Sequence, residues 1–229
     1  MQIHSFTAGP WQTNCYILSN GPSSECLIID PGMKAASAVR DVVRDHHLKP
    51  VAVLVTHGHI DHMWSVFPVA SGYGIPALVH GADRELLANP GLALSNETRL
   101  ALPTMMDTDD VFADPEEVIE VTHHMNLEIA GFNMTIHHAP GHTHGSVMFD
   151  LSGEQESIFT GDVLFAGAIG RTDLPTGSPD AMNQSLKDVV LNLDDAAKIY
   201  PGHGPSSFMH VEKANNPYLL RAAQGLPAV

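Results

Sequence analysis

The chain has 229 residues, of which 44% are hydrophobic and 16% charged, as in an ordinary globular protein with a buried core. Its net charge of −15 argues against nucleic acid and anionic membrane as partners, since both require a basic surface. No stretch approaches the roughly 18 apolar residues of a membrane span, and the first residues lack a basic start followed by an apolar run. We therefore expect a cytoplasmic protein that binds neither nucleic acid nor membrane.

Short apolar runs bounded by turn residues predict strands along the whole chain. The predicted strands cover residues 15–18, 26–30, 51–55, 77–79, 132–137, 147–151, 157–160 and 198–200. Strands and helices occur in both halves, and no Gly/Ser-rich linker divides them. This pattern favours helices layered outside two sheets, in a single domain over residues 1–229.

Three segments between these strands show helical patterns. Residues 34–48 place their apolar positions on one face, and residues 61–70 predict a short helix. Residues 179–193 also have one apolar face, with Ser178 as the expected N-cap and Pro179 at the first helical position. Residues 89–117 lack such a pattern and predict a long loop with a helical turn or two, of a kind that often covers a site.

The two cysteines, Cys15 and Cys26, lie inside apolar runs. This position predicts buried free thiols of a reducing compartment, although the sequence also allows a disulfide between them. Trp11, in the N-terminal loop, is a candidate to reach a site, whereas Trp64 is expected to pack. Met105 and its neighbour Met106 are expected to fill the core rather than line a cleft.

The densest group of metal-ligand side chains follows the predicted strand 51–55. His57, His59, Asp61 and His62 fall within six residues, and imidazole and carboxylate are ligands that borderline divalent metals prefer. Side chains two residues apart leave the same face of an extended chain, so His57 and His59 can reach one metal. The other two can point to a second metal. Four ligands leave both metals short of a full shell.

Three later strand ends offer the missing ligands. His142, Asp162 and His203 each lie next to glycine near the end of a predicted strand, where the backbone approaches closely and loops converge. A single strand-end histidine is more often structural. The four strand ends together indicate a metal centre.

The motifs at these strand ends resemble those of the metallo-β-lactamase-fold hydrolases, over nearly the whole chain. They are THGHIDH at 56–62, PGHTHGS at 140–146, TGD at 160–162 and PGHGP at 201–205. Five further stretches are similar to the short bacterial glyoxalase II-like enzymes, of the hydroxyacylglutathione hydrolase type. These stretches are residues 13–16, 29–32, 161–165, 169–175 and 216–219.

The resemblance implies an α/β fold, a four-layer αβ/βα sandwich with the site at the sheet edges. It also implies two divalent metal ions, zinc first, with iron or manganese as alternatives because a His/Asp site does not choose sharply among them. The implied ligands are His57, His59 and His142 for the first metal, Asp61, His62 and His203 for the second, and Asp162 as the bridge.

The implied chemistry is cleavage of a thioester such as S-lactoylglutathione. Two metals about 3.5 Å apart can share a hydroxide and lower its pKa toward neutrality. That hydroxide, which Asp61 helps to orient, attacks the carbonyl and expels a thiolate. A thiolate has a conjugate-acid pKa of roughly 8.5, so it leaves without a strong general acid.

The sequence departs from longer glyoxalase II enzymes at two places. Only 26 residues follow His203, too few for the C-terminal helical region that helps those enzymes grip glutathione, so the thiol carrier stays open. His144 stands where many relatives have another residue; we favour a loop residue over a substrate contact. Arg171 is expected to pair with Asp173, and it is also a candidate contact for an anionic substrate.

Four alternative functions are weighed against thioester hydrolysis. A mononuclear iron persulfide dioxygenase shares the fold and the stretch 170–173, but residues 201–205 favour the hydrolase. A non-catalytic metal-binding protein is disfavoured because a structural zinc needs four ligands, not seven. A true β-lactamase usually has Cys where Asp162 stands and is exported. A nuclease is disfavoured by the charge of −15.

Overall fold

The computed structural model describes residues 1–108, 110–153 and 156–229, and in this part of the chain the strands form two sheets of six. The first sheet has the order β1-β2-β3-β4-β5-β6 and the second the order β12-β11-β10-β9-β8-β7. The strands of the first sheet are β1 (Gln2–Ala8), β2 (Thr13–Ser19), β3 (Glu25–Ile29), β4 (Lys49–Leu54), β5 (Ala77–His80) and β6 (Val118–Val121). Those of the second are β7 (Asn126–Ile129), β8 (Phe132–His138), β9 (Val147–Ser152), β10 (Ser157–Gly161), β11 (Lys198–Pro201) and β12 (Ser207–Phe208).

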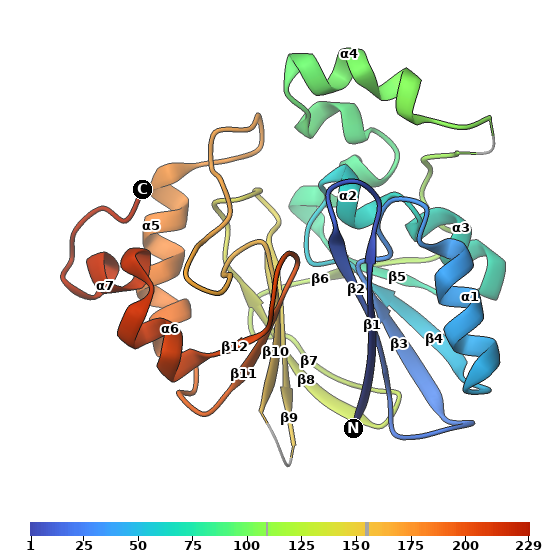
Figure 1. The fold of residues 1–229 in the computed structure, drawn as a ribbon, viewed down its shortest axis with the longest axis horizontal. Helices are drawn as coiled ribbons and strands as arrows, with labels where there is room; N and C mark the ends of the chain where they lie inside the picture. The colour runs from blue at the N-terminus through green and yellow to red at the C-terminus, as the bar shows by residue number, and fades with distance from the viewer. Residues whose placement is uncertain (109, 154–155) are drawn as a thin grey trace.

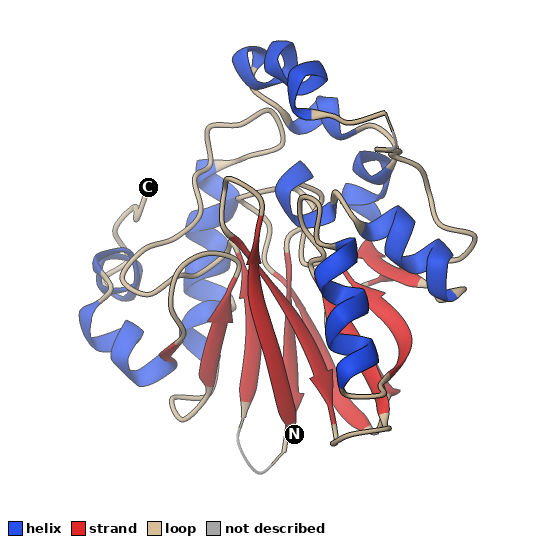
Figure 2. Ribbon diagram, turned by 45° about the vertical axis from the view of Figure 1, so that its right-hand side comes forward, coloured by secondary structure: helices blue, strands red, loops and turns tan. Residues whose placement is uncertain are grey.

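Helices cover the outer face of each sheet, so the molecule has the layers helix, sheet, sheet, helix (Figure 1). The α-helices are α1 (Ala36–Asp45), α2 (Ile60–Met63), α3 (Val66–Tyr73), α4 (Asn96–Met105), α5 (Pro179–Asp188), α6 (Met209–Asn215) and α7 (Pro217–Ala223). The 3₁₀ helices are η1 (Gly81–Leu87), η2 (Pro90–Ala93) and η3 (Val190–Asn192). Figure 2 shows the strands enclosed between helices on both sides, with α4 above the upper ends of the strands. The predicted four-layer α/β sandwich is confirmed.

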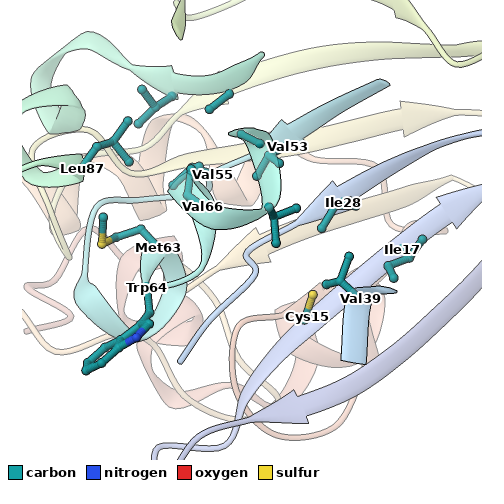
Figure 3. Close-up of a cluster of buried hydrophobic side chains, with 14 of the residues drawn as sticks. Cys15, Ile17, Ile28, Val39, Val53, Val55, Met63, Trp64, Val66 and Leu87 are labelled. Carbon is teal, nitrogen blue, oxygen red and sulfur yellow. The ribbon is translucent and has the colours of Figure 1, made fainter. Parts of the chain in front are cut away.

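Alternate residues of each strand build different cores. Ile17 of β2 packs toward α1 and α3, in the cluster drawn in Figure 3, whereas Leu18 packs between the two sheets. In the second sheet, Phe159 faces the other sheet, and Ile158 packs under α5, α6 and α7. Side chains of a strand alternate between its faces, so strands buried on both faces read as continuous apolar runs.

Every predicted strand lies within or at the end of an observed one, and four observed strands were not predicted. The missed strands are β1, β6, β7 and β12. The helix predicted over 34–48 is shorter, and the helix predicted over 61–70 is divided into α2 and α3. Ser178 caps α5 by accepting a hydrogen bond from the Ala181 amide, as predicted, but α5 ends at Asp188 and η3 follows.

The prediction of a loop over 89–117 is wrong in part, because α4 is a helix of ten residues. It begins where Ser95 Oγ accepts the amide of Thr98, and it has no buried residue. Pro103 lies within its last turn, where it has no amide to donate to the carbonyl four residues earlier. Asp109, also in this segment, lies outside the described residues. The interpretation of residues 1–229 as one domain stays a prediction.

In the described part of the chain, no helix is both long and apolar enough to span a membrane. Cys15 and Cys26 are buried free thiols, as predicted. Burial, and to a lesser extent Asp30, holds the pKa of Cys15 well above its usual range. Burial raises the pKa of Cys26 to about 12.

We expect neither cysteine to react with a thiol reagent in the folded protein, because reaction requires both thiolate and access. Titration with Ellman's reagent should give no thiol in native buffer and two per chain in denaturant. Rapid reaction of either thiol in native buffer would contradict this packing.

Candidate metal centre

The cluster of ligand-type residues after β4 lies where the chain turns from strand to helix. His57 and His59 precede α2, and His59 is its N-cap, with φ of −66° and ψ of 143°. Asp61 and His62 lie inside that single-turn helix. Because the backbone changes from extended to helical at His59, the two pairs of side chains point in different directions. One short segment thus contributes to two neighbouring groups of donors.

Three further donors come from the ends of other strands. His142 lies in the turn between β8 and β9, Asp162 directly follows β10, and His203 follows β11. β10 and β11 run parallel, and a bridge between Thr13 and His203 joins the start of β2 to the same place. Both sheets therefore deliver donors to one edge, and all seven predicted ligand residues come together there.

The first donor group consists of His57, His59 and His142, which are all buried. His142 Nε2 lies 2.7 Å from His59 Nδ1 and 3.2 Å from His57 Nε2. Three ring nitrogens that converge in this way cannot all be paired by one another, because each contact requires one of the two atoms to carry a proton. Within the described residues, His59 Nε2 is also buried without a hydrogen-bond partner. This donor set fits a cation.

Burial keeps His57 and His59 neutral. Burial, followed by the neighbouring His62 and His142, holds the pKa of His57 well below its usual value. Burial and then His142 lower the pKa of His59 to about 3. Near pH 7 both side chains are therefore in the form of imidazole that binds a metal.

The second donor group consists of Asp61, His62 and His203. His203 Nε2 lies 3.2 Å from Asp61 Oδ2 and 3.3 Å from His62 Nε2. Burial opposes ionisation of Asp61, but His62 and a hydrogen bond from His203 hold the pKa of this carboxyl below its usual range. Burial also opposes protonation of His62, yet Asp162 and Asp61 raise its pKa well above the usual value. Buried opposite charges thus stabilise one another here.

Asp162 lies between the two donor groups. Its Oδ2 is 3.4 Å from His142 Nε2 and 3.5 Å from His203 Nε2, and its Oδ1 is 3.3 Å from His62 Nε2. Burial raises the pKa of this carboxyl, but the charge and hydrogen bond of His62 outweigh burial and lower it. An ionised carboxylate in contact with both groups fits a ligand shared by two cations.

Asp30 holds the donor His62 and the neighbouring Thr56 by hydrogen bonds, a role that the sequence did not predict. Its carboxylate accepts hydrogen bonds from the amide and hydroxyl of Thr56, at 2.8 and 2.6 Å, and from His62 Nδ1 at 2.9 Å. The bond to Nδ1 leaves Nε2 of His62 free to face the site. The signals in the sequence are an acidic residue between an apolar run and Pro31-Gly32, and the similarity of residues 29–32 to the glyoxalase II-like enzymes.

Two backbone carbonyls orient other histidines. His142 Nδ1 donates to the carbonyl of Arg171 at 2.8 Å, and His203 Nδ1 donates to that of Trp11 at 3.1 Å. Thr13 Oγ1 donates to Asp61 Oδ2 at 2.9 Å. No sequence pattern reveals a carbonyl partner, because every residue has a carbonyl group.

An open cleft lies over the donors, and five of them form its floor: His59, Asp61, His142, Asp162 and His203. Besides the donors it is lined by Trp11, Ile60, Leu94, Ser95, Glu97, Thr98, Arg171 and Leu174. The segment that leads into α4 thus forms one wall, in agreement with the expectation that residues 89–117 cover a site. Trp11 reaches the cleft, whereas Trp64 is buried and donates to Asp110 at 2.7 Å.

The tentative substrate contacts differ in position. Arg171 lines the cleft and pairs with Asp173 through two contacts of 2.7 Å, as predicted. The side chain of His144 is exposed and does not line the cleft; its carbonyl accepts a bond from His138. Met105 and Met106 pack against the core under the first sheet rather than lining the cleft.

Comparison with known proteins gives the family. The model of the metallo-beta-lactamase superfamily matches residues 8–203. The chain belongs to this superfamily. Hydroxyacylglutathione hydrolase GloC of Haemophilus influenzae is 32% identical over 223 residues, which cover 96% of this chain and 98% of GloC.

Two solved structures of the superfamily are similar over nearly the whole chain. BLEG-1, described as a B3 metallo-beta-lactamase, has a TM-score of 0.83 and 33% identity, and covers 95% of this chain and 99% of its own. TTHA1623, solved in a di-iron-bound form, has a TM-score of 0.75 and 31% identity, and covers 94% of this chain and 99% of its own. Metallo-hydrolases of this superfamily use such His/Asp clusters, so the present cluster supports a metal-dependent hydrolase.

We expect His59→Ala to lower the Zn²⁺ content per chain and His144→Ala to leave it at the wild-type value. His59 belongs to the first donor group, whereas the side chain of His144 is exposed. Metal analysis by atomic emission after gel filtration measures both variants. An equal loss of Zn²⁺ in both variants would mean that the turn at 140–146 is wrongly assigned.

Proposed function

We propose that this centre binds two divalent cations. His57, His59 and His142 would hold the first, Asp61, His62 and His203 the second, and Asp162 both. The observation that supports this proposal is the position of Asp162, with its two oxygens within 3.5 Å of nitrogens from both donor groups. Two bound cations supply Lewis-acid polarisation of a carbonyl and lower the pKa of water. Zinc is our first choice, with iron or manganese as alternatives.

We propose that the reaction is thioester hydrolysis on a small molecule in the cytoplasm, of the glyoxalase II type. The similarity to GloC over 96% of the chain supports this reaction. This reaction needs no general acid for its leaving group, and among the described residues the titratable ones that line the cleft besides the donors are only Glu97 and Arg171. A thiolate needs no proton to leave, whereas an amine does. Asp61, held by Thr13, orients the attacking water from the floor of the cleft.

A β-lactamase is the second candidate, because BLEG-1 is similar over 95% of this chain at 33% identity. A β-lactam differs from a thioester in its leaving group, which is a nitrogen atom that must be protonated. Besides the donors Asp61 and Asp162, the acid that lines the cleft in the described part of the chain is Glu97, which is exposed. This difference favours the thioester, and direct assay separates the two functions.

The proposed function is tested by metal analysis together with a substrate panel. Protein loaded with Zn²⁺, Fe²⁺ or Mn²⁺ is assayed on S-D-lactoylglutathione, an acyl thioester of a small neutral thiol, a β-lactam and glutathione persulfide. We expect two metals per chain and hydrolysis of thioesters at least 100-fold above the β-lactam. One iron per chain with oxygen uptake on glutathione persulfide would overturn the proposal, and so would metal-loaded protein without any activity on thioesters.

We expect Arg171→Ala to raise KM for an anionic thioester about 5- to 10-fold and to leave kcat nearly unchanged. An exposed charge-assisted contact is worth roughly 1 kcal/mol, and Arg171 lies on the wall of the cleft, with its side chain 61% exposed. Asp173→Asn is the matched control, since it removes the ion pair with Arg171 but keeps the arginine. In this variant KM should equal the wild-type value or fall below it. A loss of kcat at constant KM in Arg171→Ala would exclude a role in substrate binding.

A further inference from the structure

Asp83 is a buried carboxyl residue that joins the two loops carrying the first donor group. It lies in η1, directly after β5, and its side chain is completely buried. Its Oδ2 accepts hydrogen bonds from the amide of Gly58 at 2.8 Å and from the hydroxyl of Thr143 at 2.6 Å. Its Oδ1 accepts the amide of Gly145 at 2.7 Å. In the described part of the chain, these three donors to the Asp83 carboxyl all lie in the two loops that carry the first donor group.

These partners immediately surround the three ligands of the first group. Gly58 lies between His57 and His59, and Thr143 directly follows His142. The loops are 83 to 85 residues apart in sequence, so no local contact fixes the distance between them. The carboxyl of Asp83 is hydrogen-bonded to both loops, and within the described residues none of these bonds comes from a residue of the second donor group.

The packing around Asp83 explains why both loops have glycine at the contact. A Cβ on Gly145 would lie 2.5 Å from Cγ of Asp83, and a Cβ on Gly58 would lie 2.6 Å from Leu86 of the same 3₁₀ helix. Real Cβ atoms do not approach so closely. Backbone amides can reach the Asp83 carboxyl only because these two positions have no side chain.

We propose that Asp83 is a positioning residue that sets the affinity of the first metal position and leaves the second unaffected. This inference depends on the two-metal centre of the proposed function. Partners that orient metal ligands typically change metal affinity about 10- to 100-fold when they are removed. Asparagine cannot replace Asp83, because its NH₂ group would face either the Gly58 amide or the Gly145 amide, both of which are donors.

The test uses two backgrounds that isolate each metal position. His203→Ala removes a ligand of the second position and His59→Ala a ligand of the first, so each background retains one position intact. We expect Asp83→Asn to weaken Zn²⁺ binding about 10- to 100-fold in the His203→Ala background. In the His59→Ala background the same change should alter Zn²⁺ affinity less than twofold. Competition with a chromogenic chelator measures both affinities.

Two further variants keep the test decisive. Arg84→Gln changes the half-buried neighbour of Asp83, which pairs with Asp114 and Glu120, and should alter neither affinity. Thr143→Val removes one of the three hydrogen bonds and should weaken the first position about 3- to 10-fold, so it decides the matter if Asp83→Asn does not fold. The unfolding temperature of each metal-free variant is recorded alongside.

A merely structural role for Asp83 predicts a different result, with both metal positions weakened equally as the metal-free protein loses stability. That result would overturn the inference while leaving the two-metal centre in place, and so would unchanged Zn²⁺ binding in the His203→Ala background. Failure of the wild-type protein to bind two Zn²⁺ ions would instead remove the proposed function and this inference with it.

Discussion

The structure depends on holding two carboxylates and five imidazoles together, most of them buried, with Asp61 and His203 partly exposed at the cleft. Burying an unpaired charge costs several kcal/mol, and removing one partner of a buried pair is more costly than the pair itself is stabilising. Asp162 and His62 are buried and in contact, and His62 also donates a hydrogen bond to the buried Asp30. Such a cluster can persist only if the backbone is held rigidly around it. Four strand ends from two sheets, packed on three apolar cores, provide that rigidity.

Much of the fold could be predicted from the sequence because its central strands are buried on both faces. β3 and β4 read as apolar runs for this reason. The strands that were missed lie toward the edges or are short: β1 has mostly exposed or half-buried side chains, and so does β7. α4 was missed because it has no buried face to give a periodic pattern, and its start depends on the cap at Ser95. A helix that depends on a capping hydrogen bond and a strand at the edge of a sheet are therefore hard to predict from the pattern of apolar residues.

The donors could be predicted because their chemistry is carried by residue type and by position at strand ends. The groups that hold the donors could not. Asp30 and Asp83 act through backbone amides, hydroxyls and ring nitrogens that lie 25 to 62 residues away in sequence. The contacts within the first sheet form only after β3, β4 and β5 pair in parallel and bring their following loops side by side. The contacts of Asp83 with Thr143 and Gly145 also require the second sheet, because these two residues lie in the turn between β8 and β9. A buried carboxyl of this kind resembles any other acidic residue in the sequence.

The floor and the wall of the cleft are built differently, and this difference suggests how one type of metal centre can serve different substrates in the superfamily. The donors follow strands that are buried in the cores, whereas the wall at Leu94 to Thr98 leads into α4, a helix without any buried residue. Changes in that wall alter the shape and charge of the cleft without moving a donor. GloC and BLEG-1 are about equally similar to this chain, yet they are described as a hydroxyacylglutathione hydrolase and a beta-lactamase. Overall similarity therefore does not distinguish these two reactions, and we expect the residues of the wall, rather than the donors, to determine which substrate is bound.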